Sequence, residues 1–251
     1  MEWTADSTVL SVRHHGETSA IVSLLTDARG RHLGLVRGGA GRKLRGVLQA
    51  GNDVRATWRG RLDEHLGTYT IELIKSRAAM VLDDANRLAA LSALCATTDM
   101  ALAEREPHSP IYHGLQAALT SIEESPYWPA VFVRYELGLL QELGFGLNLA
   151  RCVATGSTDE LIYVSPKSAS AVCRTAGEPY KDKLLPLPAF LLGSQAGVVS
   201  LDDIRNGIRL TGYFLERDVF AHSRHHEPAA RTRLVERISR ASTTSGVILG
   251  A

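Results

Sequence analysis

Two periods of hydrophobic and polar positions divide the chain near residue 80. Between residues 7 and 75, apolar and polar side chains alternate in short runs, which is typical of half-buried β-strands. The expected strands are Thr8–Arg13, Ser19–Thr26, Arg31–Arg37, Val54–Arg59 and residues 68–73. Five strands in this length predict a small antiparallel barrel or sandwich of the size of an OB-fold, and the same periodicity also fits an SH3-like barrel.

From Asp83 onward, apolar residues recur at the spacing of helices that bury one face. The expected helices cover residues 83–102, 109–122, 129–143, 186–192, 200–219 and 229–240. Asp83 or Asp84 can cap the first helix, and Ser200 with Asp203 resembles a capping box. We therefore expect an α+β chain, with a five-stranded OB-fold barrel over residues 1–80 and a mainly helical domain over residues 81–251.

The helix over residues 129–143 has clear signals at both ends. Pro129 suits a first helical turn because it has no N–H group to leave unpaired. Gly144 stands where a left-handed residue would end the helix. One apolar stripe runs along the helix, formed by Phe132, Tyr135, Leu139, Leu140 and Leu143. Arg134 lies one residue from this stripe and could frame its edge. Most helices of this kind only pack in a core, so a second role for Arg134 is a hypothesis.

Composition argues against membrane-spanning and disulfide-stabilised proteins. No apolar run reaches the roughly 18 residues of a transmembrane helix. The N-terminus lacks the basic and apolar segments of a signal peptide, so we expect none. The cysteines, Cys95, Cys152 and Cys173, form a sparse and odd set, which favours a reducing cytoplasm over a disulfide framework.

The net charge of +1 hides an uneven distribution of charge along the chain. Residues 1–80 hold 12 Lys or Arg against 8 Asp or Glu, a balance of +4. Residues 81–204 hold 8 against 15, a balance of −7, and residues 205–251 hold 8 against 4, again +4. Such asymmetry suggests a polyanionic partner for the basic regions.

The strongest positive charge falls within the predicted barrel. Residues 29–62 contain nine Lys or Arg and one acid, Asp53. A solvated basic face is the ordinary interpretation of a charge run, but this density on an OB-type barrel favours nucleic-acid binding. We expect a flexible basic loop between the third and fourth strands to contact the phosphate backbone. The candidate DNA-binding residues are Arg31, Arg37, Arg42, Lys43, Arg45, Arg55 and Arg59.

Enzymatic alternatives have weak support in the sequence. The glycine-rich stretch at residues 37–46 lacks the closing Gly-Lys-Ser/Thr of a P-loop and the helix that must follow it. A metal-dependent nuclease needs clustered carboxylates, which the basic region does not offer. The cluster at residues 222–227, with three histidines, lacks the motif of a hydrolase or zinc peptidase. A nuclease or NTPase remains the main alternative, and a pure protein-interaction scaffold the other.

Residues 151–183 resemble a zinc ribbon that has lost half of its ligands. Each of two Cys-x-x-Cys-like knuckles keeps its first cysteine, Cys152 or Cys173, but has Thr155 or Ala176 at the second position. Two thiolates cannot close a tetrahedral structural zinc site, and no histidine lies in this segment. We therefore expect a degenerate zinc-ribbon-like insert with no metal and no other cofactor.

Taken together, these segments resemble the RecO family of bacterial recombination-repair mediators over most of the chain. The matching segments, in order, are Gly16-Glu17, Ile21–Thr26, Gly30, Val36–Gly38, Arg42–Gln49, Tyr135–Leu140, Leu143–Phe145, Cys152 and, more weakly, Ser223-Arg224. Their order and spacing carry the resemblance. The chain departs from the pattern in its insert, which some members of the family hold with four cysteines.

The resemblance implies a function that no single motif gives. It implies an N-terminal OB-fold, no enzymatic turnover, binding of single- and double-stranded DNA and annealing of complementary strands. It further implies that the protein works with RecR to load the RecA recombinase onto DNA covered by single-stranded-DNA-binding protein. A cytoplasmic, nucleoid-associated location follows from this role.

The resemblance also places one partner contact on the helical domain. Single-stranded-DNA-binding protein ends in an acidic, apolar tail, which needs an apolar groove with a cation at its rim. The helix over residues 129–143 and its exit offer Leu137, Leu140 and Phe145 beside Arg134. The alternative is that Arg134 only pairs with Glu136 or Glu142, and the sequence leaves the two equally open.

Overall fold

The structure, a computed structural model, describes residues 1–193, 199–221 and 227–241. The histidine cluster at residues 222–226 and the weak match at Ser223-Arg224 therefore lie outside the described residues. The chain forms two compact units, Met1–Glu123 with Pro228–Leu234, and Glu124–Glu227 with Val235–Ala251. Among the described helices, none combines the length and apolar character needed to cross a bilayer.

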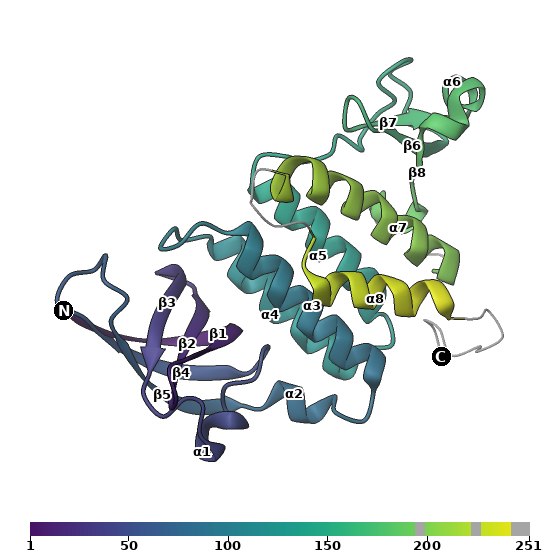
Figure 1. The fold of residues 1–251 in the computed structure, drawn as a ribbon. Helices are drawn as coiled ribbons and strands as arrows, with labels where there is room; N and C mark the ends of the chain where they lie inside the picture. The colour runs from purple at the N-terminus through teal and green to yellow at the C-terminus, as the bar shows by residue number, and fades with distance from the viewer. Residues whose placement is uncertain (194–198, 222–226, 242–251) are drawn as a thin grey trace. The chain divides into compact units, whose positions relative to one another are not determined.

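Five strands close into a barrel in the first unit, coloured purple to blue in Figure 1. They are β1 (Glu2–His15), β2 (Ser19–Thr26), β3 (Gly30–Val36), β4 (Asp53–Arg59) and β5 (Thr68–Lys75). Their order around the barrel is β1-β2-β3-β5-β4, and β4 pairs back with β1. All neighbours are antiparallel except β3 and β5, which meet in parallel at Leu35 and Thr68. This OB-like topology confirms the predicted barrel.

Strand β1 is longer than its hydrophobic pattern predicts. It begins at Glu2 instead of Thr8, because its first half pairs with β4 and its second half pairs with β2. A bulge between Val9 and Ser11 marks the change of partner. One strand therefore serves both sides of the barrel, which brings the N-terminal residues against the end of β4.

The barrel core is built around aromatic residues. The Trp58 side chain is completely buried, and Tyr69 shares a hydrogen bond with Nδ1 of His32 at 2.9 Å. Gly34 lies beneath the Tyr69 ring, where an added Cβ would come within 2.3 Å of it, so this position requires glycine. Not every apolar residue of β5 lies in the core: Tyr69 is buried, but Leu73 is 44% exposed.

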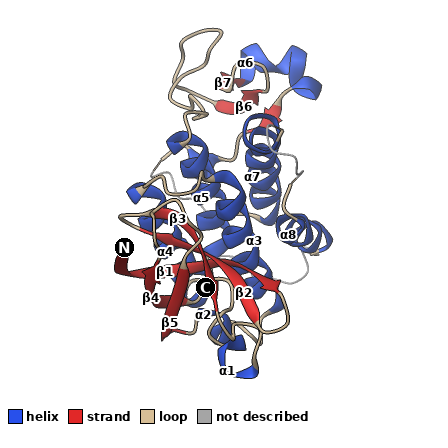
Figure 2. Ribbon diagram, turned by 60° about the vertical axis from the view of Figure 1, so that its left-hand side comes forward, coloured by secondary structure: helices blue, strands red, loops and turns tan. Residues whose placement is uncertain are grey.

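Besides the barrel and residues 228–234, the described part of the first unit contains four helices. They are α1 (Arg42–Arg45), α2 (Arg77–Met80), α3 (Ala85–Ala101) and α4 (Ser109–Glu124). The Asp84 side chain accepts hydrogen bonds from the backbone N–H groups of Asn86 and Arg87, which confirms Asp84 as the cap of α3. The secondary-structure colouring of Figure 2 distinguishes these helices from the strands of the barrel.

A buried ionic network joins the barrel to α4. Arg77, whose side chain is 6% exposed, donates to Asp53 Oδ2 and to Glu123 Oε1, both at 2.8 Å. It also donates to Gln116 Oε1 at 2.8 Å. Glu123 is 1% exposed and accepts a second hydrogen bond from Lys75 at 2.6 Å. Each buried charge thus has an oppositely charged partner, as burial of a charge requires.

The second unit contains α5 (Trp128–Glu142) and α7 (Leu201–Phe214). Pro129 lies in the first turn of α5, and Gly144 has a φ of +85°, so both end signals are confirmed. The capping box of Ser200 and Asp203 is present at the start of α7. The predicted helix over residues 200–219 instead changes after Phe214 into a π-helix, η3 (Leu215–Phe220).

A small three-stranded sheet stands at the insert, with the order β7-β6-β8. The strands are β6 (Leu161–Ser165), β7 (Ser170–Cys173) and β8 (Leu185–Pro186), and they appear in green in Figure 1. The remaining elements of the described residues are α6 (Arg174–Gly177), η1 (Glu178–Lys183), η2 (Ala189–Leu191) and α8 (Ala229–Arg240). The expected helix over residues 186–192 is thus only a 3-10 turn at Ala189–Leu191, and Pro186 belongs to β8.

Candidate nucleic-acid interface

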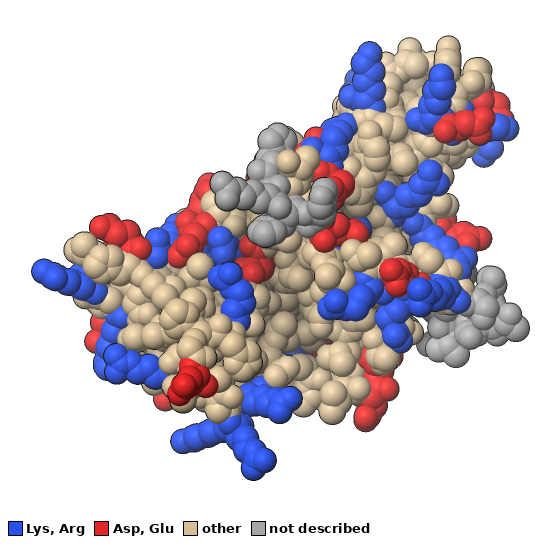
Figure 3. All heavy atoms as spheres, viewed as in Figure 1, with Lys and Arg blue, Asp and Glu red and all other residues tan. Residues whose placement is uncertain are grey.

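The basic segment between β3 and β4 is a short helix where a flexible loop was predicted. Leu44 packs partly against the barrel core, so α1 is anchored by its one apolar side chain. The three cations beside it, Arg42, Lys43 and Arg45, are exposed and form no ion pair within the described residues. Lys and Arg side chains project from the surface at α1 in Figure 3. The anchored turn presents three unneutralised charges to solvent.

Two other candidates on β3 and its exit differ sharply from each other. Arg37 follows the last residue of β3 and is exposed. The Arg31 side chain is 17% exposed, donates from Nε to the carbonyl of Leu102 at 2.8 Å and pairs with Asp99 at 3.4 Å. Arg31 therefore stabilises the first unit, whereas Arg37 is available to a ligand.

The candidates on β4 are exposed but already paired. The register of β1 and β4 places Glu2 opposite Arg59 and Asp6 opposite Arg55. Arg55 donates from Nε to Asp6 at 2.8 Å, and Arg59 donates to Glu2 at 2.9 Å. The hydrogen bond from Arg55 lowers the pKa of the Asp6 carboxyl. This face is therefore less positive than its count of arginines suggests.

A hollow of about 580 Å³ opens beside α1. Its walls come from the end of β1, the turn after β3, α1 and the segment before β4. The lining residues are Val12, His14, Gly39, Ala40, Arg45, Leu48, Gln49 and Ala50. Arg45 thus belongs both to the exposed basic turn and to a concave surface. A concave surface with a cation in its wall is compatible with a site for a nucleic-acid backbone.

A second hollow, of about 250 Å³, was not found from the sequence. We call it the Trp3 hollow, and it is lined by Trp3, Ala28, Arg29, His32, Asp63, Arg105 and Pro107. The Trp3 ring stacks on Trp58, with ring centroids 6.0 Å apart and an interplanar angle of 15°. The sequence signal was weak because the lining residues are distributed over a hundred positions.

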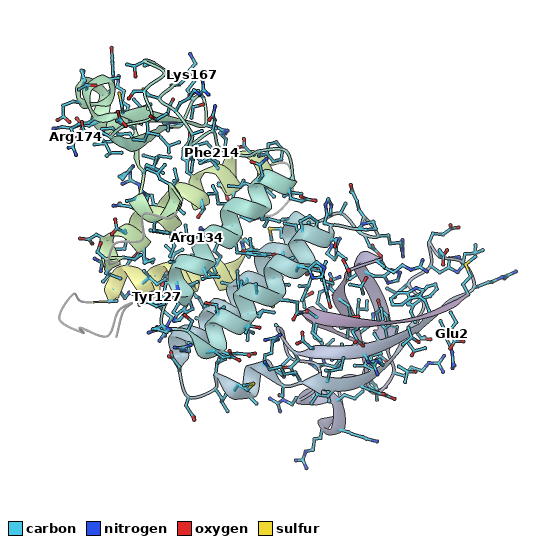
Figure 4. All side chains as sticks on the ribbon, turned by 180° about the vertical axis from the view of Figure 1, so that it is seen from behind. Glu2, Tyr127, Arg134, Lys167, Arg174 and Phe214 are labelled. Atoms are coloured by element: carbon cyan, nitrogen blue, oxygen red, sulfur yellow. The ribbon has the colours of Figure 1, made fainter. Side chains whose placement is uncertain are left out.

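The candidate partner residues on α5 occupy different environments. Figure 4 shows Arg134 part-way along α5, where its Nη2 donates to the carbonyl of Phe190 at 2.7 Å. Leu137 is half-buried, and Phe145 is 41% exposed beyond the end of the helix. Leu140 is completely buried and therefore belongs to the core of the second unit. The accessible part of the predicted groove is thus limited to Arg134, Leu137 and Phe145.

The two half-knuckles of the insert lie together in the structure. Cys152 and Cys173 are buried and unbridged, and Thr155 Oγ1 lies 3.6 Å from the sulfur of Cys173. Burial acts to raise the pKa of Cys152, but hydrogen bonds from Thr155 and from the backbone at Cys173 and Ala154 lower it to about 6. Within the described ranges, no three His, Cys, Asp or Glu side chains form a group that could hold a metal ion. That the protein binds no zinc stays a prediction.

Comparison with known protein families divides the chain close to the end of the barrel. Residues 1–77 match the model described as "Recombination protein O N terminal", and residues 82–227 match "Recombination protein O C terminal". The first match ends just after β5, so it corresponds to the barrel with the candidate DNA-binding residues. The second match includes α5 and the insert.

Curated relatives are similar over almost the whole chain. A DNA repair protein RecO of Rhodospirillum centenum is 50% identical over 249 residues, which is 98% of each chain. One from Caulobacter vibrioides is 47% identical over 241 residues, covering 96% of this chain and 99% of the relative. One from Rhodopseudomonas palustris is 48% identical over 244 residues, covering 96% and 97%.

Proposed function

The chain belongs to the RecO family of DNA repair proteins, and from that premise we propose that it is a non-enzymatic recombination mediator. In this role it binds single- and double-stranded DNA and anneals complementary strands. The DNA-binding surface lies on the barrel, within residues 1–80, and the partner contacts lie on residues 81–251. The proposal further includes a cytoplasmic location at the nucleoid. Three unbridged cysteines are compatible with this location, because thiols stay reduced in the cytoplasm.

The exposed basic turn α1 is the single observation that best supports DNA binding. Arg42, Lys43 and Arg45 have no acidic partners among the described residues, and Arg37 lies exposed close by in sequence. Cations that are not neutralised by the protein can each release a counterion from DNA, which gives affinity without sequence preference. Annealing requires that unpaired strands of any sequence be held, so a backbone-directed site suits this function.

The proposed partners are RecR, the C-terminal tail of single-stranded-DNA-binding protein and, indirectly, RecA. For the tail, the support is the exposed ring of Phe145 and the position of Arg134 on α5. One nitrogen of Arg134 donates to the Phe190 carbonyl, which fixes the direction of the guanidinium. Its other N–H groups can bind a carboxylate, the terminal group of such a tail. The proposal of RecR and RecA as partners rests on the family alone.

A strand-annealing assay tests the proposal. Two complementary oligonucleotides, one carrying a donor dye and the other an acceptor, should anneal faster with the protein than without it. The reaction should need no ATP and should leave both strands at full length when Mg²⁺ is present. Strand cleavage or ATP hydrolysis by the purified protein would support the nuclease or NTPase alternative. No effect on annealing and no DNA binding would favour a pure scaffold.

A further inference from the structure

The Trp3 hollow combines an aromatic ring with cationic side chains in the first unit. It lies where the start of β1, the β2–β3 turn and the β4–β5 loop come together with residues 105–107. At about 250 Å³ it is smaller than the usual pocket for a drug-sized molecule, so it suits one planar ring system and not a larger ligand. None of its lining residues belongs to α1.

The Trp3 ring is held in one orientation while part of it stays accessible. It stacks on the buried Trp58 and meets His32 edge-to-face at 5.1 Å. Trp58 is itself fixed, because its indole N–H donates to the carbonyl of Leu66 at 3.0 Å. A half-buried aromatic residue supported by a rigid second ring is a preorganised stacking surface, with little side-chain entropy to lose when a ligand binds.

Two arginines line this hollow. The guanidinium of Arg29 lies over Trp3, 5.8 Å from the ring centroid, and forms no ion pair within the described residues. Arg105 lines the same hollow: its Nη2 pairs with Glu104 Oε1 at 3.0 Å, whereas its buried Nε has no hydrogen-bond partner among the described residues. An unpaired buried donor is uncommon in folded proteins and needs an explanation. A ligand that brings a hydrogen-bond acceptor into the hollow would give the Arg105 Nε–H a partner and so explain it.

The backbone at Arg105 is strained and is held in that state by its surroundings. Arg105 has a φ of +66°, which is unfavourable for a residue with a side chain. Its N–H donates to the carbonyl of Arg31 at 2.7 Å. Gly30 lies against Glu106 so closely that an added Cβ would come within 1.9 Å of the Glu106 carbonyl oxygen. Such strain is found preferentially where a side chain must be aimed at a ligand.

We propose that the Trp3 hollow binds one unpaired nucleobase, which stacks on Trp3 in the place that the exposed Arg29 guanidinium takes in the free protein, with Arg29 and Arg105 then contacting the adjacent phosphates. This inference rests on the proposed DNA binding and adds a base-binding subsite to it. A base in a duplex has both faces covered by its neighbours, so this subsite accepts single-stranded DNA only. Stacking is tolerant of sequence because every base has a π-face. The basic turn α1 then serves both forms of DNA, while the Trp3 hollow distinguishes between them.

The test compares single-stranded and duplex DNA of equal length by fluorescence anisotropy. Trp3→Leu, which keeps apolar bulk but removes the aromatic face, should weaken single-strand binding roughly tenfold. Duplex binding should stay within about twofold. Trp3→Phe should retain most of the affinity for the single strand. Tyr180→Leu, a change of an aromatic residue that is 62% exposed in η1, is the matched control and should alter neither.

A second measurement needs no variant. The unmodified protein should bind a strand with several contiguous abasic sites about tenfold more weakly than the same strand with all its bases. Equal affinity for the two strands, or an unchanged single-strand affinity in a folded Trp3→Leu protein, would overturn the base-binding subsite alone. Failure of the unmodified protein to bind either form of DNA would instead overturn both the subsite and the proposed function.

Discussion

Replacing Arg77 with methionine should destabilise the first unit strongly, although Arg77 is not a candidate for binding DNA. The guanidinium donates to Asp53, Glu123 and Gln116, each at 2.8 Å, and to Thr120 at 3.3 Å. Methionine fills a similar volume but carries neither the charge nor the donors. The substitution therefore leaves two carboxylates without their shared cation.

The expected loss follows from what each carboxylate retains. Removing one partner of a buried ion pair costs about 3–5 kcal/mol in the free energy of unfolding. Glu123 keeps its hydrogen bond from Lys75, and Asp53 keeps one from Gln116 at 3.0 Å. The cost for Arg77→Met should therefore fall near the lower limit, about 3 kcal/mol. Adding Glu123→Gln should recover part of the loss, because it removes the buried charge of a carboxylate that has lost one of its two cations.

The two compact units require a probe that reports on one of them. A Trp128→Phe background removes the tryptophan of the second unit and leaves Trp3 and Trp58 as fluorescent reporters of the barrel. Urea unfolding followed in this background should show the loss for Arg77→Met. Arg55→Met, at an ion pair with side chains 56% and 53% exposed, is the control and should show no measurable change. A loss of less than about 1 kcal/mol for Arg77→Met would refute the reasoning.

Three further predictions concern binding and the insert. Replacing Glu2 by Gln and Asp6 by Asn should strengthen DNA binding, because each change frees an arginine on β4. The slope of log affinity against log salt concentration should steepen by roughly 1–2 units. An unchanged slope would place this face outside the interface. The depressed pKa of Cys152, about 6 against an ordinary 9.0, adds stability that is fully present above about pH 9 and is lost as pH falls through 6. Thr155→Val should raise the pKa of Cys152, which ultraviolet titration of the thiolate measures. An unchanged pKa would contradict the role of the Thr155 hydrogen bond in lowering it. Arg134→Ala should weaken binding of an acidic tail peptide about tenfold or more without changing DNA binding. A peptide affinity equal to that of the unmodified protein would exclude α5 as the tail site.

The sequence predicted the elements of the fold better than their interactions. Period-2 alternation located all five strands, and the caps at Asp84 and Ser200 were correct because capping depends on residues within one turn. The first half of β1 was missed because it alternates polar side chains with Trp3 and Ala5 and carries no apolar run. Its partner, β4, is about fifty residues away, and local patterns contain no information on such pairing.

The same limit applies to the candidate site. Nothing near Arg31 in sequence indicates that Asp99 lies beside it, and the carboxylates that pair with Arg55 and Arg59 come from another strand. Charge counts therefore overestimated the free positive charge of the strands and were accurate for α1. On α5, helical periodicity counted Leu140 in the apolar stripe, and the candidate groove also used it; the packing of the second unit decides between the two, because Leu140 is completely buried.

The measurement that tests the central proposal most directly is DNA affinity as a function of salt concentration. It compares the unmodified protein with a variant in which Arg42, Lys43 and Arg45 are all replaced by alanine. These side chains are exposed, so the fold should survive their removal. If α1 binds the phosphate backbone, the variant should bind more weakly, and the slope of log affinity against log salt should fall by roughly 2–3 units, about 0.7–0.9 for each cation that no longer neutralises a phosphate. An affinity and slope equal to those of the unmodified protein would contradict a DNA-binding site at α1.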